Sequence, residues 1–250
     1  MLNETPMNLN QQIESWLEQR IASSIADDKP FITLSYAQSW DGSITTRSGE
    51  TLSFSGEESL KLTHQIRSLH DGILVGVGTI LSDDPQLTVR EWKGDNPQPI
   101  VLDSHLRTPA AAKICHHPDK RCWILTLESG ADSVSEQVDL LPVETENGLG
   151  KGELKDEVPL DTAMKLLRQR GIRSLMVEGG AAVITAFLQA RMVDALILTV
   201  APRLVGGYKG VGDLQSAGSA EQFIIEPIHY AQAGADLIVW GDLQNSGSGN

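Results

Sequence analysis

The first periodic pattern of apolar and polar residues lies near the start of the chain. Six apolar residues there fall on one face of a helix: Leu9, Ile13, Trp16, Leu17, Ile21 and Ile25. Spacings of three and four residues are typical of an amphipathic helix. The polar stretch DDKP at 27–30 ends the pattern. We therefore expect a helical extension over residues 1–28, which either packs on the following domain or extends a contact with a second copy.

Short apolar runs then alternate with helical patterns. A helix is predicted after Ser55, which forms a capping-box pattern with Glu58. A second helix is predicted from Asp161 to the residues before Gly171, and a third over the segment AAVITAFLQA. Strands are predicted in FITLSYA, DGILVGVGT, QPIVLDS, RCWILTL, SLMVEGG, ALILTVAP and DLIVWGD.

This alternation predicts an α/β fold with a mixed, mostly parallel central sheet flanked by helices. The last strand segments follow one another without a clear helix, so we expect antiparallel strands at the C-terminal end. Residues 143–158 are rich in Glu, Gly and Lys and show no periodicity, which is typical of a surface loop. Residues 244–250 are Gln, Asn, Gly and Ser, and we expect a disordered tail. One domain over residues 29–243 remains.

Composition narrows the classes of function. The net charge is −13 and there is no basic stripe, so we expect no nucleic-acid partner. No apolar run approaches the roughly 18 to 20 residues of a membrane helix, and we expect no membrane partner. The first residues lack a secretory signal pattern. Cys115 and Cys122 are expected to be buried, reduced thiols, and we predict a cytoplasmic protein.

Two glycine-containing loops are candidate phosphate sites. One is VGVGTILSDDP at 75–85, and the other is VEGGAAVI at 177–184. Main-chain amides at a helix N-terminus bind anions, and dinucleotide sites use the same order of strand, glycine and helix. A single loop of this kind is more often an ordinary tight turn. Two such loops in one α/β chain favour nucleotide binding.

Charged residues near the predicted strand ends are further candidates. Glu178 ends an apolar strand, where a carboxylate is costly to bury without a partner. It is either a solvated strand end or a charge at the N-terminus of the next helix, or it is a carboxylate directed at a ligand hydroxyl or proton. Arg90 follows the first glycine loop and is the best candidate for an anion ligand among Arg67, Arg90, Arg107 and Arg203. The six histidines show no ligand spacing, so we expect no metal site.

Four motifs in order resemble one known family: FITLSYAQSWDGSI, IRSLHDGILVGVGTILSDDPQLTVR, PIVLDSHLRTP and LMVEGGAAVITAFLQARMVDALILTVAPRLVGG. They resemble the pyrimidine reductase of riboflavin biosynthesis, which has a dihydrofolate-reductase-like fold. That reductase occurs alone or fused to a zinc deaminase, whose signature is absent here. The resemblance covers residues 29 to about 243.

The resemblance implies an NADPH-dependent oxidoreductase. It would reduce the ribosyl side chain of a 5-amino-6-(5-phosphoribosylamino)pyrimidine to the ribityl form, and it would be a homodimer. Both the deaminated and the non-deaminated pyrimidine stay open as substrates. A reductase of the same fold with another pterin-like or pyrimidine substrate is the alternative, because Ser35 stands where the fused enzymes carry a lysine. A nucleotide-binding protein without catalytic activity is a further alternative. Such a protein would not require the residues that line the substrate, which are named below.

The matching motifs also imply site residues. The cofactor would be lined by Ala37, Ser53, Thr79, Asp83, Ser104, Gly180, Ala181, Ala182, Val183 and Ile184, with the run continuing to Ala186. The substrate would be lined by Thr51, Arg67, Leu87, Arg90 and Glu178. The arginines would clamp the 5′-phosphate, preferably through both nitrogens of the fork. Glu178 is the catalytic candidate, and it would hold a ribose hydroxyl or assist ring opening.

Two further residues carry weaker assignments. Arg107 would meet the adenosine 2′-phosphate that distinguishes NADPH from NADH. Asp41 is a candidate for proton transfer, although capping of the turn at Gly42 is the favoured role. The turn SWDG at 39–42 would lie beside the nicotinamide.

Overall fold

The computed structural model describes residues 7–24, 27–48, 52–129, 134–144, 157–214 and 223–245. Within them, a nine-stranded sheet has the order β10-β11-β8-β1-β7-β3-β4-β5-β6. Its strands are β1 (Phe31–Ser39), β3 (Gly72–Gly76), β4 (Gln98–Leu102), β5 (Cys122–Thr126), β6 (Val138–Pro142), β7 (Ser174–Val177), β8 (Ala195–Ala201), β10 (Phe223–Ala233) and β11 (Asp236–Asn245). A small second sheet pairs β2 (Ser43–Thr45) with β9 (Tyr208–Lys209).

The helices are α1 (Leu9–Ser23), α2 (Glu57–Ser68), α3 (Val77–Asp83), α4 (Leu160–Gln169) and α5 (Ala181–Gln189), with a 3-10 turn η1 (Lys113–His116). Within the large sheet, β11 runs against its neighbours β8 and β10, and the other paired strands are parallel. The predicted α/β class, with a mostly parallel sheet and an antiparallel C-terminal part, is therefore confirmed. β11 continues to Asn245, two residues into the predicted tail, and 246–250 lie outside the described residues.

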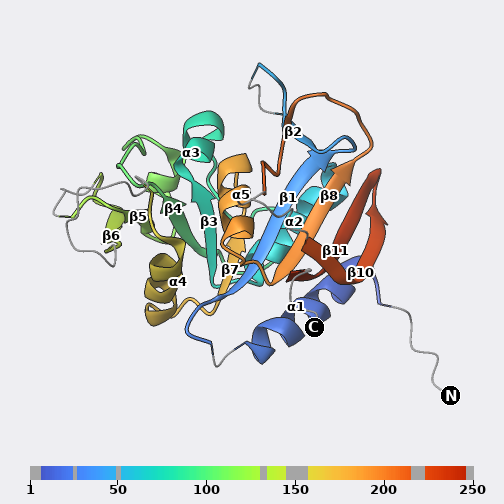
Figure 1. Ribbon diagram of the computed structural model, residues 1–250, viewed down its shortest axis with the longest axis horizontal. Coiled ribbons are helices and arrows are strands. Elements are labelled where there is room, and N and C mark those ends of the chain that lie inside the picture. Colours follow the sequence, from blue (N-terminus) through green and yellow to red (C-terminus); the bar gives the residue numbers. More distant parts are fainter. Residues whose placement is uncertain are drawn as a thin grey trace.

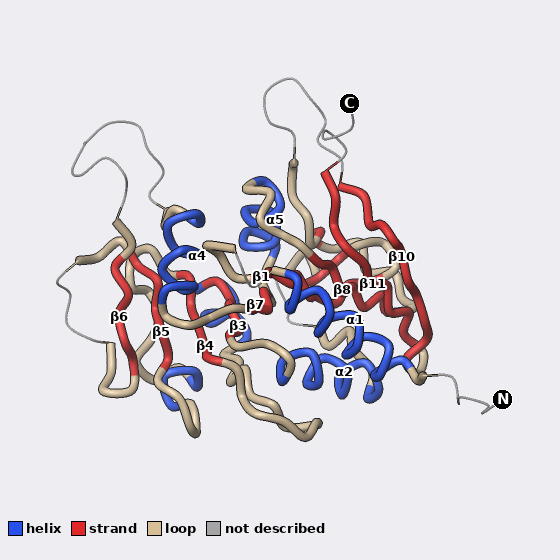
Figure 2. Tube along the Cα trace, turned by 90° about the horizontal axis from the view of Figure 1, so that it is seen from below, coloured by secondary structure: helices blue, strands red, loops and turns tan. Residues whose placement is uncertain are grey.

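Helices cover the large sheet on both sides (Figures 1 and 2). α1 and α2 pack on one face, where Ile13, Leu17 and Ile66 are buried in the first hydrophobic core. α4 and α5 pack on the other face, where Leu167 and Phe187 belong to the second core. Burying apolar surface on both faces is what a parallel sheet requires. The predicted N-terminal helix thus packs on the domain's own sheet.

Two predicted helix starts are wrong. α2 begins at Glu57 with Gly56 as its N-cap, so Ser55 does not form the predicted capping box. A remote carboxylate takes over, because Asp236 in the β10–β11 hairpin accepts the Gly56 N–H at 2.7 Å and the Ser59 hydroxyl. α4 begins at Leu160 after Pro159.

Asp161 lies in the first turn of α4 and pairs with Lys29 and Lys165. Gly171 follows this helix with φ +93°, which confirms the predicted stop. Cys115 and Cys122 are free and buried as predicted, and burial raises the pKa of both thiols. Among the described residues, no helix combines the length and apolarity that crossing a membrane would need.

His70 joins the end of α2 to β1. Its Nδ1 lies 2.7 Å from the Ile66 carbonyl oxygen, and its Nε2 lies 2.8 Å from the Thr33 hydroxyl. A carbonyl only accepts, so Nδ1 carries a hydrogen. Burial is the main cause that lowers the pKa of His70 to about 4. The ring is therefore neutral at pH 7, and Thr33 donates to Nε2.

We predict that His70 makes the protein less stable as the pH falls from about 6.5 to about 4. In this window the unfolded ring binds a proton that the folded ring excludes, so acid favours unfolding. The effect is at most about 3 kcal/mol, since one pKa unit corresponds to about 1.4 kcal/mol. Urea unfolding across this range should show a shallower pH dependence for His70→Gln than for the wild type. The exposed His116→Gln is the control, and equal slopes for wild type and His70→Gln would contradict the prediction.

Candidate active site

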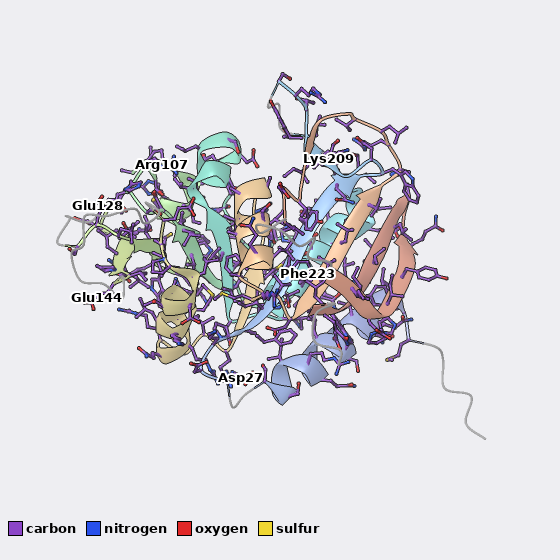
Figure 3. All side chains as sticks on the ribbon, viewed as in Figure 1. Asp27, Arg107, Glu128, Glu144, Lys209 and Phe223 are labelled. Atoms are coloured by element: carbon purple, nitrogen blue, oxygen red, sulfur yellow. The ribbon has the colours of Figure 1, made fainter. Side chains whose placement is uncertain are left out.

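The carboxyl ends of neighbouring parallel strands gather most of the predicted site residues. β1, β7, β3 and β4 are adjacent in the sheet, and the loops after them begin at Trp40, Glu178, Val77 and Asp103. Open α/β sheets bind ligands outside this edge. Figure 3 shows Arg107 and Lys209 at the same upper edge in that view. The candidate site therefore lies at the carboxyl edge of the sheet.

Two helix N-termini meet at this edge without side-chain caps. Gly76 is the N-cap of α3 and Gly180 is the N-cap of α5. A β-carbon on Gly180 would lie 3.5 Å from the Thr79 hydroxyl, so the two loops are in contact. The first amides of a helix have no intrahelical partner, which in α5 applies to Ala181 and Ala182. These groups suit an anionic ligand such as a pyrophosphate.

Val183 explains the other glycines of these loops. β-carbons on Gly76 and Gly179 would come within 2.5 and 2.6 Å of the Val183 side chain. Both positions must be glycine to let α5 approach β3 and β7, independently of any ligand. Val183 and Ile184 are themselves buried in the second core. Of these two predicted cofactor residues, only main-chain atoms can face a ligand.

A buried ion pair lies beside the helix N-termini. Arg67, in the last turn of α2, donates from Nε to Glu178 Oε1 and from Nη2 to Glu178 Oε2, both at 2.7 Å. Arg67 Nη1 also donates to the Thr88 carbonyl oxygen at 3.0 Å. The two side chains are 11% and 18% exposed. Burial alone would lower the pKa of Arg67, but the Glu178 carboxylate outweighs it and raises that pKa.

This pair rules out one of the roles left open for Glu178. The residue is not a solvated strand end, because Arg67 binds both of its oxygens. A carboxylate in such a fork is fixed in orientation by two parallel hydrogen bonds. Its remaining lone pairs can accept a hydrogen bond from a ligand hydroxyl. The Arg67 fork points to Glu178, so it does not form the bidentate phosphate clamp expected for that arginine.

Arg90 can still bind an anionic ligand, because it is exposed and forms no ion pair with Glu178. Its Nη1 donates to the Thr88 hydroxyl at 2.9 Å. Arg90, Glu91, Trp92 and Lys93 line a shallow hollow in the surface. Leu87, predicted to line the substrate, is buried in the first core with φ +56°. Its side chain therefore faces the core.

Asp41 holds a turn. Its carboxylate accepts hydrogen bonds from the hydroxyls of Ser39 and Ser43 at 2.6 and 2.8 Å. It also accepts from the amides of Val205 and Gly206 at 2.9 and 3.0 Å. These hydrogen bonds hold the pKa of Asp41 well below its usual range. The bond from the Ser39 hydroxyl has the largest effect, followed by the bond from the Val205 amide. Lys209 Nζ is a fifth donor, 3.2 Å from Asp41 Oδ2. These bonds fit the favoured role in the turn, and the proton-transfer role does not fit a carboxylate with five donors.

The remaining predicted cofactor residues lie on three segments of this edge. Ala37 is on β1 next to Thr199 of β8. Ser53 is exposed, and its carbonyl accepts from Arg203 Nη1 at 3.2 Å. Ser104 follows β4, and its hydroxyl accepts the Val158 amide at 3.1 Å.

Asp83 is exposed at the end of α3, and Thr51 lies outside the described residues. Arg107 is exposed after β4, with its Nε 4.0 Å from Asp103 Oδ1. Ser35 is buried on β1 opposite Ile197.

Two residues of the site were missed by sequence reasoning. Thr88 supplies the carbonyl for Arg67 and the hydroxyl for Arg90, and His64 contacts the Arg90 amide. His64 precedes Arg67 by three residues, which places both on one side of a helix. That spacing was the available signal for His64. Thr88 contacts Arg67 through its main-chain carbonyl. Every residue has this group, so the sequence gives no signal for the contact.

A mostly parallel sheet with open helix N-termini and a buried ion pair at its carboxyl edge is typical of nucleotide-dependent α/β enzymes. Residues 30–239 match the family described as the RibD C-terminal domain. The chain belongs to that family, which confirms the resemblance and the fold it implied.

Named relatives agree with this assignment. A riboflavin biosynthesis protein RibD from Aquifex aeolicus is 30% identical over 225 residues, covering 90% of this chain and 61% of the relative. The chain thus spans less than two thirds of that protein. A 2,5-diamino-6-ribosylamino-4(3H)-pyrimidinone 5′-phosphate reductase from Debaryomyces hansenii is 33% identical over 215 residues, covering 79% of this chain and 85% of the relative.

Solved structures show the same fold. The riboflavin biosynthesis reductase Rib7 of Saccharomyces cerevisiae superposes with a TM-score of 0.72 at 24% identity, covering 93% of this chain and 100% of that one. RibD of Acinetobacter baumannii gives a TM-score of 0.75 at 23% identity, covering 94% of this chain and 64% of that one.

We predict that Glu178→Gln destabilises the fold through Arg67. The amide is nearly isosteric but removes the charge opposite a mostly buried guanidinium. The expected loss is roughly 2 kcal/mol, less than for complete removal of a buried partner because glutamine still accepts one bond. Urea unfolding measures the change. Glu128→Gln, on an exposed residue 3.6 Å from His105, is the control. Equal stability of the two variants would show that the ion pair contributes nothing.

Proposed function

We propose that this chain is an NADPH-dependent reductase of riboflavin biosynthesis. It would convert the ribosyl side chain of a 5-amino-6-(5-phosphoribosylamino)pyrimidine to the ribityl form. The named reductases in the family support the reaction class. The observation that carries the proposal is the Arg67–Glu178 pair beside two open helix N-termini. A dinucleotide and a sugar phosphate would then meet at one edge of the sheet.

The cofactor would occupy the side of α3 and α5. The open amides of Ala181 and Ala182, with Gly180 at the N-cap, fit a pyrophosphate. Thr79 lies against Gly180 and adds a hydroxyl. Arg107 is exposed at the same edge, and we assign it to the 2′-phosphate that distinguishes NADPH from NADH. When bound, the nicotinamide supplies hydride.

The substrate would occupy the side of Arg90 and Glu178. Arg90 binds the 5′-phosphate, since the Arg67 fork is occupied. A closed ribosylamine does not accept hydride, so the sugar must open to an imine that is protonated before reduction. Glu178 accepts a hydrogen bond from a ribose hydroxyl and orients the opened sugar. Because Arg67 binds both oxygens of Glu178, we assign this residue to positioning the sugar and not to supplying the proton.

The direct test is loss of reduced-nicotinamide absorbance with two substrates side by side. One is the diaminopyrimidinone phosphoribosylamine, and the other is its deaminated uracil form. We expect clear turnover of one substrate, and faster turnover with NADPH than with NADH. Binding of NADPH without turnover of either substrate would overturn the proposal.

The same assay tests Glu178. We expect Glu178→Gln to bind NADPH as the wild type does, because the helix amides are unchanged. Turnover should fall about tenfold or more, since the lost charged acceptor orients the reacting sugar. Glu128→Gln is again the matched control. Wild-type turnover by Glu178→Gln would remove the residue from the reaction.

We also propose a homodimer, formed through the uncovered side of the C-terminal strands. Tyr36, Leu198, Val239 and Tyr230 lie opposite one another across β1, β8, β11 and β10, which places them in one row on one face. Tyr230 is 72% exposed. α1 packs on the opposite face, and no helix of the described residues lies in front of β10 and β11 in Figure 1. An apolar sheet face of this kind is typical of a subunit interface.

Sedimentation equilibrium tests the dimer. The wild type should sediment at twice the chain mass of 27.1 kDa, and Tyr230→Glu should sediment at 27.1 kDa. The reason is that a carboxylate within an apolar interface would be buried without a partner. Leu60→Glu, at an exposed position of α2, is the control and should stay dimeric. A wild type that sediments only at the chain mass would refute the dimer. The predicted cytoplasmic location stays a prediction.

A further inference from the structure

His64 is a buried histidine that contacts the main chain of the proposed phosphate ligand. It lies on α2, with no side-chain surface exposed to solvent. Its Nδ1 accepts a hydrogen bond from the Arg90 amide at 3.0 Å. The two residues are 26 positions apart in the chain, and α3 lies between them. The contact therefore joins α2 to the loop that follows α3.

The loop around Arg90 is fixed at three points. The Val89 amide donates to Asn96 Oδ1 at 2.6 Å, so two consecutive amides of this loop bond to side chains. The Arg90 guanidinium donates to the Thr88 hydroxyl at 2.9 Å. Both the main chain and the charged group of Arg90 are thus held in place.

The hydrogen bond to Arg90 determines the state of the His64 ring. An accepting Nδ1 requires a neutral ring with its hydrogen on Nε2. This Nε2 is buried and has no hydrogen-bond partner among the described residues. A buried N–H without a partner lowers stability, and a leucine of similar size would avoid that loss. The distinctive contribution of His64 is therefore its bond to Arg90.

The surroundings keep the ring neutral. Burial is the largest cause, followed by the positive charges of Arg67 and Arg90, and together they lower the His64 pKa to about 4. Glu178 and Glu91 act in the opposite direction. A protonated ring would turn an N–H toward the Arg90 amide and break the contact. At neutral pH the acceptor is present.

We propose that His64 is a positioning residue that holds the Arg90 main chain so that the guanidinium meets the 5′-phosphate of the substrate. This inference rests on the proposed function, which assigns the phosphate to Arg90. His64 itself need not touch the substrate. It acts through the geometry of one loop.

Two variants separate the acceptor from the bulk of the ring. His64→Asn keeps an acceptor, because its Oδ1 is attached at the same point as histidine Nδ1. His64→Leu fills a similar volume without an acceptor. We expect His64→Leu to raise the KM for the phosphorylated substrate about tenfold, as for loss of one hydrogen bond, with kcat nearly unchanged. His64→Asn should stay close to the wild-type KM.

A double-variant cycle with Arg90→Ala tests whether His64 acts through Arg90. If it does, His64→Leu raises KM in the wild-type background and has no further effect in Arg90→Ala. An equal rise in both backgrounds would overturn the proposal, because it would indicate general damage to the fold. Thermal unfolding checks each variant. If His64→Leu does not fold, His64→Gln replaces it. The glutamine amide lies at the position of histidine Nε2, so this variant also lacks an acceptor at the position of Nδ1.

Titration with inorganic phosphate separates failure of this inference from failure of the proposed function. It needs no turnover, so it decides even if the wild type reduces neither pyrimidine. Weaker phosphate binding by His64→Leu, with binding by His64→Asn preserved, supports the positioning role. Equal binding by all three proteins, or no phosphate binding by the wild type, overturns it. Hydrogen exchange at the Arg90 amide should be faster in His64→Leu than in His64→Asn.

Discussion

Arg67 and Glu178 are 111 residues apart in the chain, and their two parallel hydrogen bonds join α2 to the end of β7. Such a fork tolerates little displacement, so both elements must be held firmly. Asp236 holds the first residues of α2, and His70 joins the other end of that helix to Thr33 on β1. The C-terminal hairpin and the first strand thus hold the helix that carries Arg67. Damage to either support is expected to reach the site through α2.

The charge distribution at the site follows from this pair. The body carries a net charge of −13, which opposes anionic ligands at long range, although salt screens exposed charges beyond roughly 8 to 10 Å. Arg67 contributes little to a local positive field, because Glu178 neutralises it at contact distance. The helix amides at Ala181 and Ala182 and the exposed guanidinium groups of Arg90 and Arg107 remain. Anion binding therefore depends on short-range, directed groups.

Much of this architecture could be predicted from local sequence patterns. The periodic apolar residues of α1 and α5 and the apolar runs of β3 and β8 carry enough signal on their own. The edge strand β10 was missed, because Pro227 and exposed polar residues interrupt its alternation. The start of α2 was missed because its cap comes from Asp236, 180 residues away from Gly56. Local sequence patterns cannot predict a cap that comes from so distant a residue.

For the site, the glycine loops and Glu178 were visible in the sequence, but their reasons were not. Gly179 is required by the packing of Val183, and the partner of Glu178 is an arginine that had been assigned to a phosphate. Residue type indicates what a group can do, whereas its neighbours in space determine which of these options remains. His64 illustrates the limit, since nothing local distinguishes it from an ordinary buried histidine.

The small sheet of β2 and β9 has a mechanical consequence. Asp41 bonds to the segments on both sides of its own turn and to the amides of Val205 and Gly206, beyond the end of β8. A β-carbon at Gly207 would overlap the Thr45 carbonyl oxygen, so the two segments lie in direct contact. The loops that leave β1 and β8 are therefore joined into one body. If these two joined loops move during a catalytic cycle, the chain must bend near Ser39 and near Ala201 at the same time. Neither loop can move without the other.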